Sequence, residues 1–461
     1  MNSYTRRSTG RSATPSRRDF LKTLAVSAAA AGLPRWAWAE EKRKPNFVVI
    51  FCDDLGYADV GCFGAPLIRT PNVDRIAAEG VKLTDFYAAP VCTPSRAQLL
   101  TGCYANRVSL PSVLFPGSKV GLHENEMTLG ELLKSAGYAT ICIGKWHLGH
   151  LPQFLPTRHG FDEYFGIPYS NDMRPTPLIE GEKTIEEPAV QATLTERYTQ
   201  RAVEFIGKNK DKPFFLYLAH TMPHTPLHVS ERFANKSKRG LYGDVVECID
   251  WGVGEILAAL ARHGLEKDTL VIFTSDNGPW LIRGEHGGSA APLRAGKGTC
   301  YEGGMRVPFV ARWPARIPQG TVCREMATEM DLLPTFGKLA GAKLPDDRII
   351  DGKDIWPLLS GVAGARTPHE AFFYYGGRNL RGVRNGQWKL MLASPAGKGG
   401  KGAAPQAIYD LSADMGEQKD MSAEQPEVVK RLEALVEKCR EDLGDAATQR
   451  QGKNVRPCGT E

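Results

Sequence analysis

The most chemically distinctive stretch of the chain is VCTPSRAQLLTG, residues 91–102, in which a cysteine comes directly before a predicted helix. Pro94 fixes its own φ and lacks a backbone donor, so it suits the first turn of a helix that continues through residues 95–100. Cys92 is therefore expected just ahead of a helix N-terminus, where unpaired N–H groups and the helix dipole favour negative charge. Arg96 adds a fixed positive charge one turn along. The stretch predicts a place for an oxyanion, although a lone cysteine there is more often a small buried side chain.

The full pattern in this stretch is C-T-P-S-R-A-x-L-L-T-G. It resembles the signature of the type I, formylglycine-dependent sulfatases, and the resemblance extends from about Pro45 to Leu411, with the strongest likeness to arylsulfatase A and N-acetylgalactosamine-6-sulfatase. The resemblance implies that a formylglycine-generating enzyme oxidises Cys92 to formylglycine, whose hydrated aldehyde forms a covalent sulfate intermediate. The implied reaction is hydrolysis of sulfate monoesters, either aryl sulfates or sulfated sugars.

Oxygen ligands follow two apolar runs of strand length. Asp53 and Asp54 come after residues 46–52, and Asp276 and Asn277 come after residues 270–274. Ligands of open α/β sheets bind beyond the carboxyl ends of the strands, and this set of oxygens suits Ca²⁺ or Mg²⁺. The resemblance favours one calcium ion that also contacts residue 92. The alternative for either pair alone is a turn or a helix cap.

Lysine and histidine occupy the other candidate positions. Lys145 and His147 follow the apolar run 139–143, His224 follows the run 214–219, and Lys297 lies in the glycine-rich loop 283–305. Alone, such residues are usually surface or structural ones. The resemblance implies that Arg96 and the two lysines bind sulfate. It also implies that His147 deprotonates the second hydroxyl of residue 92, and that His224 and Lys297 assist the leaving alcohol. We keep other candidates outside the catalytic set: His150, His220, His228, His286 and Arg306.

Strands that alternate with helices predict the fold of most of the chain. The four apolar runs above, together with helical patterns at 127–136 and 242–262, indicate a doubly wound, largely parallel α/β sheet flanked by helices. The resemblance implies an alkaline phosphatase-like fold. After residue 367, short segments and a final helix predict a smaller α+β domain with an antiparallel sheet: 371–375, 380–384, 387–392, 407–411 and 426–443.

These patterns divide the chain into four predicted regions. They are a signal peptide (1–39), a catalytic domain (40–366), a small sheet-plus-helix domain (367–445) and a flexible tail (446–461). The low-complexity run AGKGGKGAA at 396–404 is interpreted as a flexible hairpin insertion.

The leader predicts export. It contains SRRDFLK at 16–22, a short apolar run at 23–33 and AWA at 37–39, which is the order of a twin-arginine signal. The apolar run is too short for a stable membrane span. The expected partner is the twin-arginine export machinery, and the expected location is periplasmic or secreted. A net charge of +6 on 461 residues gives no case for nucleic acid, and ten cysteines show no readable disulfide framework.

Two other functions remain open at this level. One is hydrolysis of phosphate or phosphonate esters by an enzyme of the same superfamily, although phosphatases of this fold usually add a second metal. The other is non-catalytic binding of sulfated glycans, if residue 92 is unmodified. Intact-mass measurement of the peptide that contains Cys92, together with turnover of a chromogenic sulfate, distinguishes these functions from a sulfatase.

Overall fold

The computed structural model describes residues 1–3, 43–394 and 404–461. Residues 4–39 of the predicted signal peptide and residues 396–403 of the predicted insertion lie outside the described residues. Residues Lys44–Glu461 form one unit. No helix in the described ranges has both the length and the apolar character needed to cross a membrane.

Four parallel strands lie side by side at the centre of the main sheet, in the order β9, β1, β8 and β4. Their residues are almost all buried, because helices cover both faces of the sheet and polar side chains there would lose water. They are the four strands that the apolar runs predict: β1 (Asn46–Cys52), β4 (Ala139–Lys145), β8 (Phe214–Ala219) and β9 (Thr269–Ser275). Their carboxyl ends therefore share one edge of the sheet.

Further strands extend this sheet on both sides, in the order β11-β2-β10-β9-β1-β8-β4-β5-β6-β7, with β12 paired to β2. Strand β10 runs antiparallel to β9 and β2, and β6 runs antiparallel to β5 and β7. The predicted doubly wound, largely parallel fold is confirmed. The added strands are β2 (Val81–Tyr87), β5 (Glu163–Ile167), β6 (Leu178–Glu180), β7 (Lys183–Glu186), β10 (Arg306–Arg312), β11 (Thr321–Cys323) and β12 (Ala327–Thr328).

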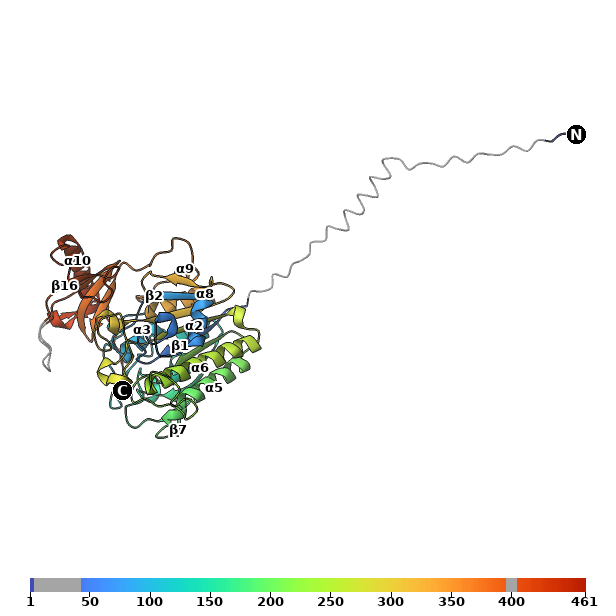
Figure 1. Cartoon of the computed structure of the whole chain (residues 1–461), viewed down its shortest axis with the longest axis horizontal. Helices are drawn as coiled ribbons and strands as arrows, with labels where there is room; N and C mark the ends of the chain where they lie inside the picture. The colour runs from blue at the N-terminus through green and yellow to red at the C-terminus, as the bar shows by residue number, and fades with distance from the viewer. Residues whose placement is uncertain (4–42, 395–403) are drawn as a thin grey trace. The chain divides into compact units, whose positions relative to one another are not determined.

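Alternate residues of β1 face two separate apolar cores. Phe47, Val49 and Phe51 lie in a core with helices α3, α4 and α8, whereas Val48 and Ile50 lie in a core with α2, α5 and α6. This period of two is the strand geometry that places neighbouring side chains on opposite faces. Figure 1 shows α5 and α6 side by side along the sheet. The helices are α2 (Pro71–Ala78), α3 (Cys92–Thr101), α4 (Leu129–Ser135), α5 (Leu194–Lys208), α6 (Leu241–Arg262) and α8 (Leu332–Ala340).

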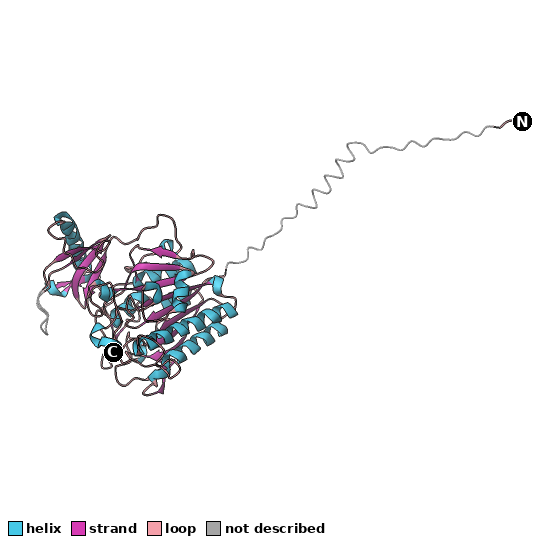
Figure 2. Ribbon diagram, in the orientation of Figure 1, coloured by secondary structure: helices cyan, strands magenta, loops and turns pink. Residues whose placement is uncertain are grey.

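A second sheet of four antiparallel strands follows, and α10 packs on it (Figure 2). The predicted small antiparallel sheet and its helix are confirmed. Its elements are β13 (Phe372–Gly376), β14 (Asn379–Asn385), β15 (Trp388–Met391), β16 (Ala407–Asp410) and α10 (Pro426–Leu443).

A buried ionic cluster joins the second sheet to the main one. The Lys389 ammonium on β15 lies 2.9 Å from Glu302 and 2.7 Å from Glu417, and all three side chains are buried. Glu302, in the short helix α7 (Glu302–Met305), also accepts a hydrogen bond from Tyr87 on β2. Burial opposes ionisation of Glu302, but Lys389 and Arg306 lower its pKa to about 2. Since these contacts cross the boundary predicted at 366/367, that boundary stays a prediction.

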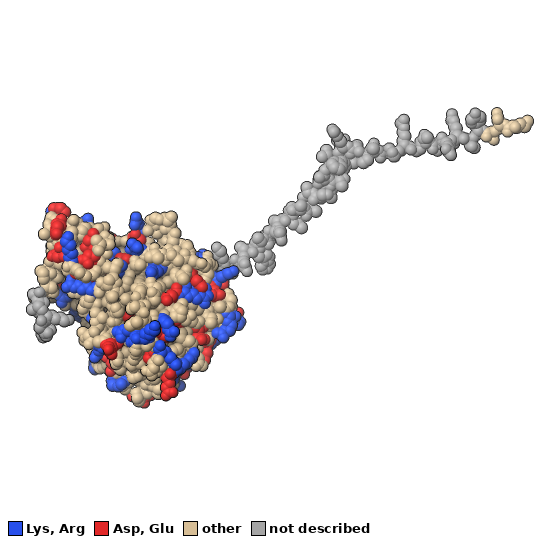
Figure 3. Space-filling model, viewed as in Figure 1, with Lys and Arg blue, Asp and Glu red and all other residues tan. Residues whose placement is uncertain are grey.

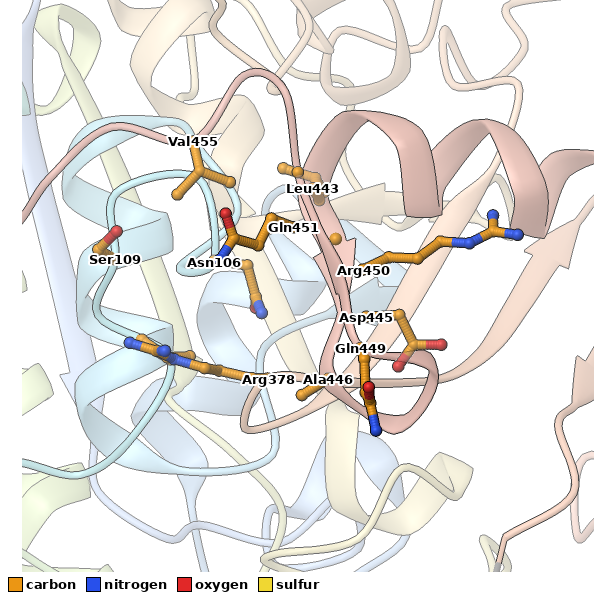
Figure 4. A pocket seen from close by; sticks show the side chains of 13 residues that line it. Asn106, Ser109, Arg378, Leu443, Asp445, Ala446, Gln449, Arg450, Gln451 and Val455 are labelled. Atoms are coloured by element: carbon orange, nitrogen blue, oxygen red, sulfur yellow. The ribbon is translucent and has the colours of Figure 1, made fainter.

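The last residues differ from the expectation of a flexible tail. Strand β19 (Gly459–Thr460) pairs with β3 (Val120–Gly121), and Arg456 forms an ion pair of 2.7 Å with Glu126. The tail also lines a pocket of about 530 Å³ beside the loop that follows α3 (Figure 4). These contacts join residues more than 300 positions apart, so the polar composition of the tail gives no sign of them.

Charged side chains of both signs are interspersed over the face of the molecule in Figure 3. Long-range binding of a polyanion depends on a field of one sign, and such mixing weakens that field on this face.

We expect His159 to make the protein less stable at acid pH. Its side chain is fully buried, neither ring nitrogen has a hydrogen-bond partner among the described residues, and burial lowers its pKa to about 4. Between pH 6.5 and 4 the unfolded chain binds a proton here and the native chain does not, so stability falls as the pH falls. His159 thereby lowers the free energy of unfolding by roughly 3 kcal/mol between these two pH values.

His159→Phe keeps a ring beside Trp146 and should remove this contribution. The measurement is the free energy of unfolding in denaturant at pH 7 and pH 4.5, with His263→Phe, at an exposed histidine, as the control. An unchanged pH dependence in His159→Phe would contradict the prediction.

Candidate active site

Three carboxylates and an amide meet where β1 and β9 end. Asp53 and Asp54 follow β1, and Asp276 and Asn277 follow β9, as predicted. The backbone N–H of Asp54 donates to Asp276 Oδ1 at 3.1 Å, and Asn277 Nδ2 donates to Asp54 Oδ1 at 2.8 Å. All four side chains are buried, so their charges are poorly screened by water.

Cys92 is the first residue of α3, and its Sγ lies 3.5 Å from Asp53 Oδ1. The preceding residue, Val91, offers no side-chain cap, so the first N–H groups of α3 remain available at this end of the helix. Only 2% of Cys92 is exposed. Burial raises the pKa of its thiol to about 12, although Lys145 and Lys297 oppose the shift. An unmodified thiol here is therefore protonated and poorly nucleophilic at neutral pH.

Each predicted cation contacts a different carboxylate. Lys145 Nζ lies 2.6 Å from Asp53, Lys297 Nζ lies 2.8 Å from Asp54, and Arg96 lies 2.9 Å from Asp276. Burial by itself lowers the pKa of Lys297, but the neighbouring carboxylates, Asp54 above all, raise it more, so the ammonium stays charged.

The carboxylates themselves shift in opposite directions. Burial opposes ionisation of Asp53, but Lys145 holds its pKa well below the usual range. Burial, with the neighbouring Asp53 charge, raises the pKa of Asp276 to about 7. Three carboxylates so close together repel one another, and a bound cation would relieve that repulsion.

His224 lies beside Asp54, with its Nε2 3.7 Å from Asp54 Oδ2. Its Nδ1 lies 3.0 Å from Asn171 Oδ1, and Asn171 Nδ2 donates to Pro226 O at 2.9 Å. Since Asn171 turns its amide nitrogen to a carbonyl, its oxygen accepts from His224 Nδ1–H, and Nε2 is left as the acceptor. Burial lowers the pKa of His224, so the ring is neutral at neutral pH.

His147 contacts backbone rather than the other candidates. Its Nε2 donates to Leu114 O at 2.9 Å, and its own carbonyl accepts from Thr93 Oγ1 at 3.0 Å. Its Nδ1 is buried without a hydrogen-bond partner among the described residues, and burial holds its pKa well below the usual range. His147 is therefore a neutral imidazole with one free lone pair.

The donor set fits a hard divalent cation. One ligand atom from each of Asp53, Asp54, Cys92 and His224 lies within 4.8 Å of the others. Asn277 Oδ1 is buried and has no hydrogen-bond partner among the described residues, which leaves an oxygen free for a cation. Carboxylate and amide oxygens are the ligands that Ca²⁺ and Mg²⁺ prefer.

Two residues of the site were missed in the sequence. Ser170 Oγ accepts a hydrogen bond of 3.2 Å from Lys145 Nζ and lies 3.3 Å from His224 Nε2, while Asn171 orients the same histidine. Both follow β5, which lies parallel to β4 but is not among the apolar runs predicted as strands. The apolar run YFGI, residues 164–167, is the sequence signal for this strand. A parallel strand there ends at the same edge of the sheet as β4, so the residues after it are candidates for the site.

Three family models match parts of this chain. The model described as Sulfatase matches residues 45–342, and the model described as N-sulphoglucosamine sulphohydrolase, C-terminal matches residues 295–442. A model of the twin-arginine translocation signal sequence matches residues 14–34, so the chain carries a signal for export across the cytoplasmic membrane.

Named relatives cover most of the chain. Arylsulfatase A of Homo sapiens is 39% identical over 85% of this chain and 87% of its own length. N-acetylgalactosamine-6-sulfatase of Mus musculus is 42% identical over 81% of this chain and 75% of its own length.

Solved structures share the fold. Ps i-CgsB in complex with k-i-k-neocarrahexaose is 33% identical, with a TM-score of 0.76 over 86% of this chain and 92% of that chain. The phosphonate monoester hydrolase of Agrobacterium radiobacter, at 20% identity and a TM-score of 0.60 over 85% of this chain and 94% of that chain, shows the fold alone. The chain belongs to the sulfatase family, and its reaction is the hydrolysis of sulfate esters.

Proposed function

We propose that Cys92, oxidised to formylglycine, is the nucleophile of this sulfatase and that sulfated saccharides are its substrates. The observation that carries the proposal is the position of Cys92, at the open N-terminus of α3 and 3.5 Å from Asp53. Formylglycine supplies a hydrated aldehyde in place of a thiol whose pKa is about 12. A sulfated saccharide is supported by the likeness to N-acetylgalactosamine-6-sulfatase and to Ps i-CgsB in complex with a neocarrahexaose.

Calcium is the proposed cofactor. Asp53, Asp54, Asp276 and Asn277, with residue 92, would hold it, and the ion would supply a positive charge that polarises the nucleophile and the sulfate oxygens. The free Oδ1 of Asn277 and the clustered carboxylates support this assignment.

The remaining charged residues have proposed roles in binding sulfate and moving protons. Lys145, Lys297 and Arg96 provide fixed positive charge for the sulfuryl oxygens. His147 accepts a proton at Nδ1, the nitrogen without a hydrogen-bond partner. The Lys297 ammonium donates a proton to the leaving oxygen, and His224 assists there once its Nε2 has taken up a proton. Ser170 and Asn171 position His224.

Burial of Cys92 supports a proposed order of maturation. Since only 2% of the residue is exposed, a formylglycine-generating enzyme must reach it before the chain folds. The twin-arginine machinery then exports the folded protein to the periplasm or beyond.

We expect Lys297→Ala to reduce turnover of sulfate monoesters by about 10²- to 10³-fold, because one preorganised positive charge is lost. The loss should be larger for poor leaving groups if Lys297 assists departure. The measurement is kcat for sulfate esters of phenols with different pKa values. The matched control is Lys82→Ala, since Lys82 is also stacked over an aromatic ring but donates to Cys62 O.

The wild type should hydrolyse a sulfate ester faster than the phosphate ester of the same phenol. A sulfate monoester carries one negative charge, whereas a phosphate monoester is largely a dianion. A clear preference for the phosphate ester would contradict the proposed function.

A further inference from the structure

A pocket of about 250 Å³ lies beside His224. Its lining residues are Asp172, Thr225, Pro226, Arg283 and His286. Asp172 follows Ser170 and Asn171, which contact His224, and Thr225 and Pro226 follow His224 itself. The segments that build one side of the active site therefore continue directly into the wall of this pocket.

Trp280 connects the remaining pocket residues, Arg283 and His286, to the active site. Its ring lies 4.5 Å from Lys297 Nζ and 3.9 Å from the Arg283 guanidinium carbon, and its centroid is 5.2 Å from that of the His224 ring. The indole thus packs against two candidate catalytic residues and holds Arg283 at the pocket. A substrate whose sulfate is bound by Lys297 has this pocket next to it.

The pocket offers both hydrogen-bond donors and hydrogen-bond acceptors. The Asp172 carboxylate accepts hydrogen bonds and the Arg283 guanidinium donates them, and both side chains are exposed. In the part of the chain that the structure describes, neither residue takes part in an ion pair. A second anionic group would be repelled by Asp172, whereas neighbouring hydroxyls can donate to Asp172 and accept from Arg283 or His286.

We propose that this pocket binds the uncharged sugar unit next to the sulfated one. Hydroxyl groups of that unit contact Asp172 and Arg283, and its apolar face lies on Pro226. This inference rests on the proposed function, because it assumes that the sulfate is bound at Lys297 and His224. It assigns specificity to Asp172, Arg283 and His286, of which only His286 stood out in the sequence.

The test compares three kinds of substrate on the calcium-loaded, formylglycine-bearing enzyme. They are monosulfated disaccharides, the corresponding sulfated monosaccharides, and 4-nitrophenyl sulfate, which has no sugar. Asp172→Asn and Arg283→Gln should each lower the ratio of kcat/KM for the best disaccharide to that for 4-nitrophenyl sulfate by about 10-fold, the scale of one hydrogen bond to a charged group. The change should lie mainly in KM, as expected for lost ground-state binding.

The matched control is Arg316→Gln, since Arg316 is also stacked over an indole, 4.9 Å from the ring of Trp313. It should leave the ratio unchanged, and circular dichroism checks the fold of every variant. Equal kcat/KM for disaccharide and monosaccharide in the wild type would overturn the inference, as would unchanged ratios in both pocket variants. A rise in Asp172→Asn with a fall in Arg283→Gln would indicate an anionic occupant and also overturn it. Absence of turnover with 4-nitrophenyl sulfate and every saccharide would instead defeat the proposed function.

Discussion

Cys92→Ala is expected to abolish hydrolysis of sulfate esters while leaving the protein folded. Alanine cannot be oxidised to formylglycine, and loss of a catalytic nucleophile typically lowers turnover by roughly 10⁴- to 10⁶-fold. The fold should tolerate the change because only one buried sulfur is removed and α3 keeps its other buried contacts. Turnover of 4-nitrophenyl sulfate and the unfolding transition of the variant measure the two effects.

Cys142→Ala is the matched control, because Cys142 is also fully buried but lies within β4, in an apolar core. It should keep turnover near that of the wild type. Mass spectrometry of the peptide that contains residue 92 should show formylglycine in the active protein. Substantial activity in Cys92→Ala, or in a wild type shown to hold unmodified cysteine, would reject the proposed nucleophile.

Asp276→Asn is expected to weaken calcium binding and activity together. Substitutions that only support a metal ligand cost about 10- to 100-fold in affinity or activity, so loss of a direct carboxylate ligand should cost at least as much. The asparagine side chain keeps the shape of the site but loses the charge that Arg96 contacts at 2.9 Å. Titration calorimetry on the metal-free protein measures the affinity, and turnover against calcium concentration measures the dependence of activity.

Asp250→Asn is the matched control for this change. Asp250 is also a buried carboxylate, but it accepts hydrogen bonds from the backbone of Asn72 and Val73 at the start of α2. The calcium affinity of the Asp250→Asn variant should equal that of the wild type. Wild-type affinity in Asp276→Asn, or full activity after exhaustive chelation with the metal content checked, would count against the site.

The four central strands could be predicted because each is a local run of apolar residues that is buried on both faces. The same runs placed Asp53, Lys145 and Asp276 at strand ends, and parallel strands bring such ends to one edge. Strand β5 was not predicted, because its five residues lie between turns and aromatic side chains in a segment that has the composition of a loop. Ser170 and Asn171 were missed for the same reason.

The sequence alone determined which chemical groups this protein has available. They are a cysteine before a helix, oxygen ligands after strands, and lysines and histidines in motifs that resemble those of sulfatases. Only the tertiary structure decided which groups meet, as with Lys297 and Asp54, which are 243 positions apart. It also decided the neutral state of His224 and His147 and the order of the C-terminal tail. The physical reason is separation along the chain. Strand and helix patterns depend on neighbouring residues, whereas ion pairs and the burial of side chains away from water depend on how distant segments pack.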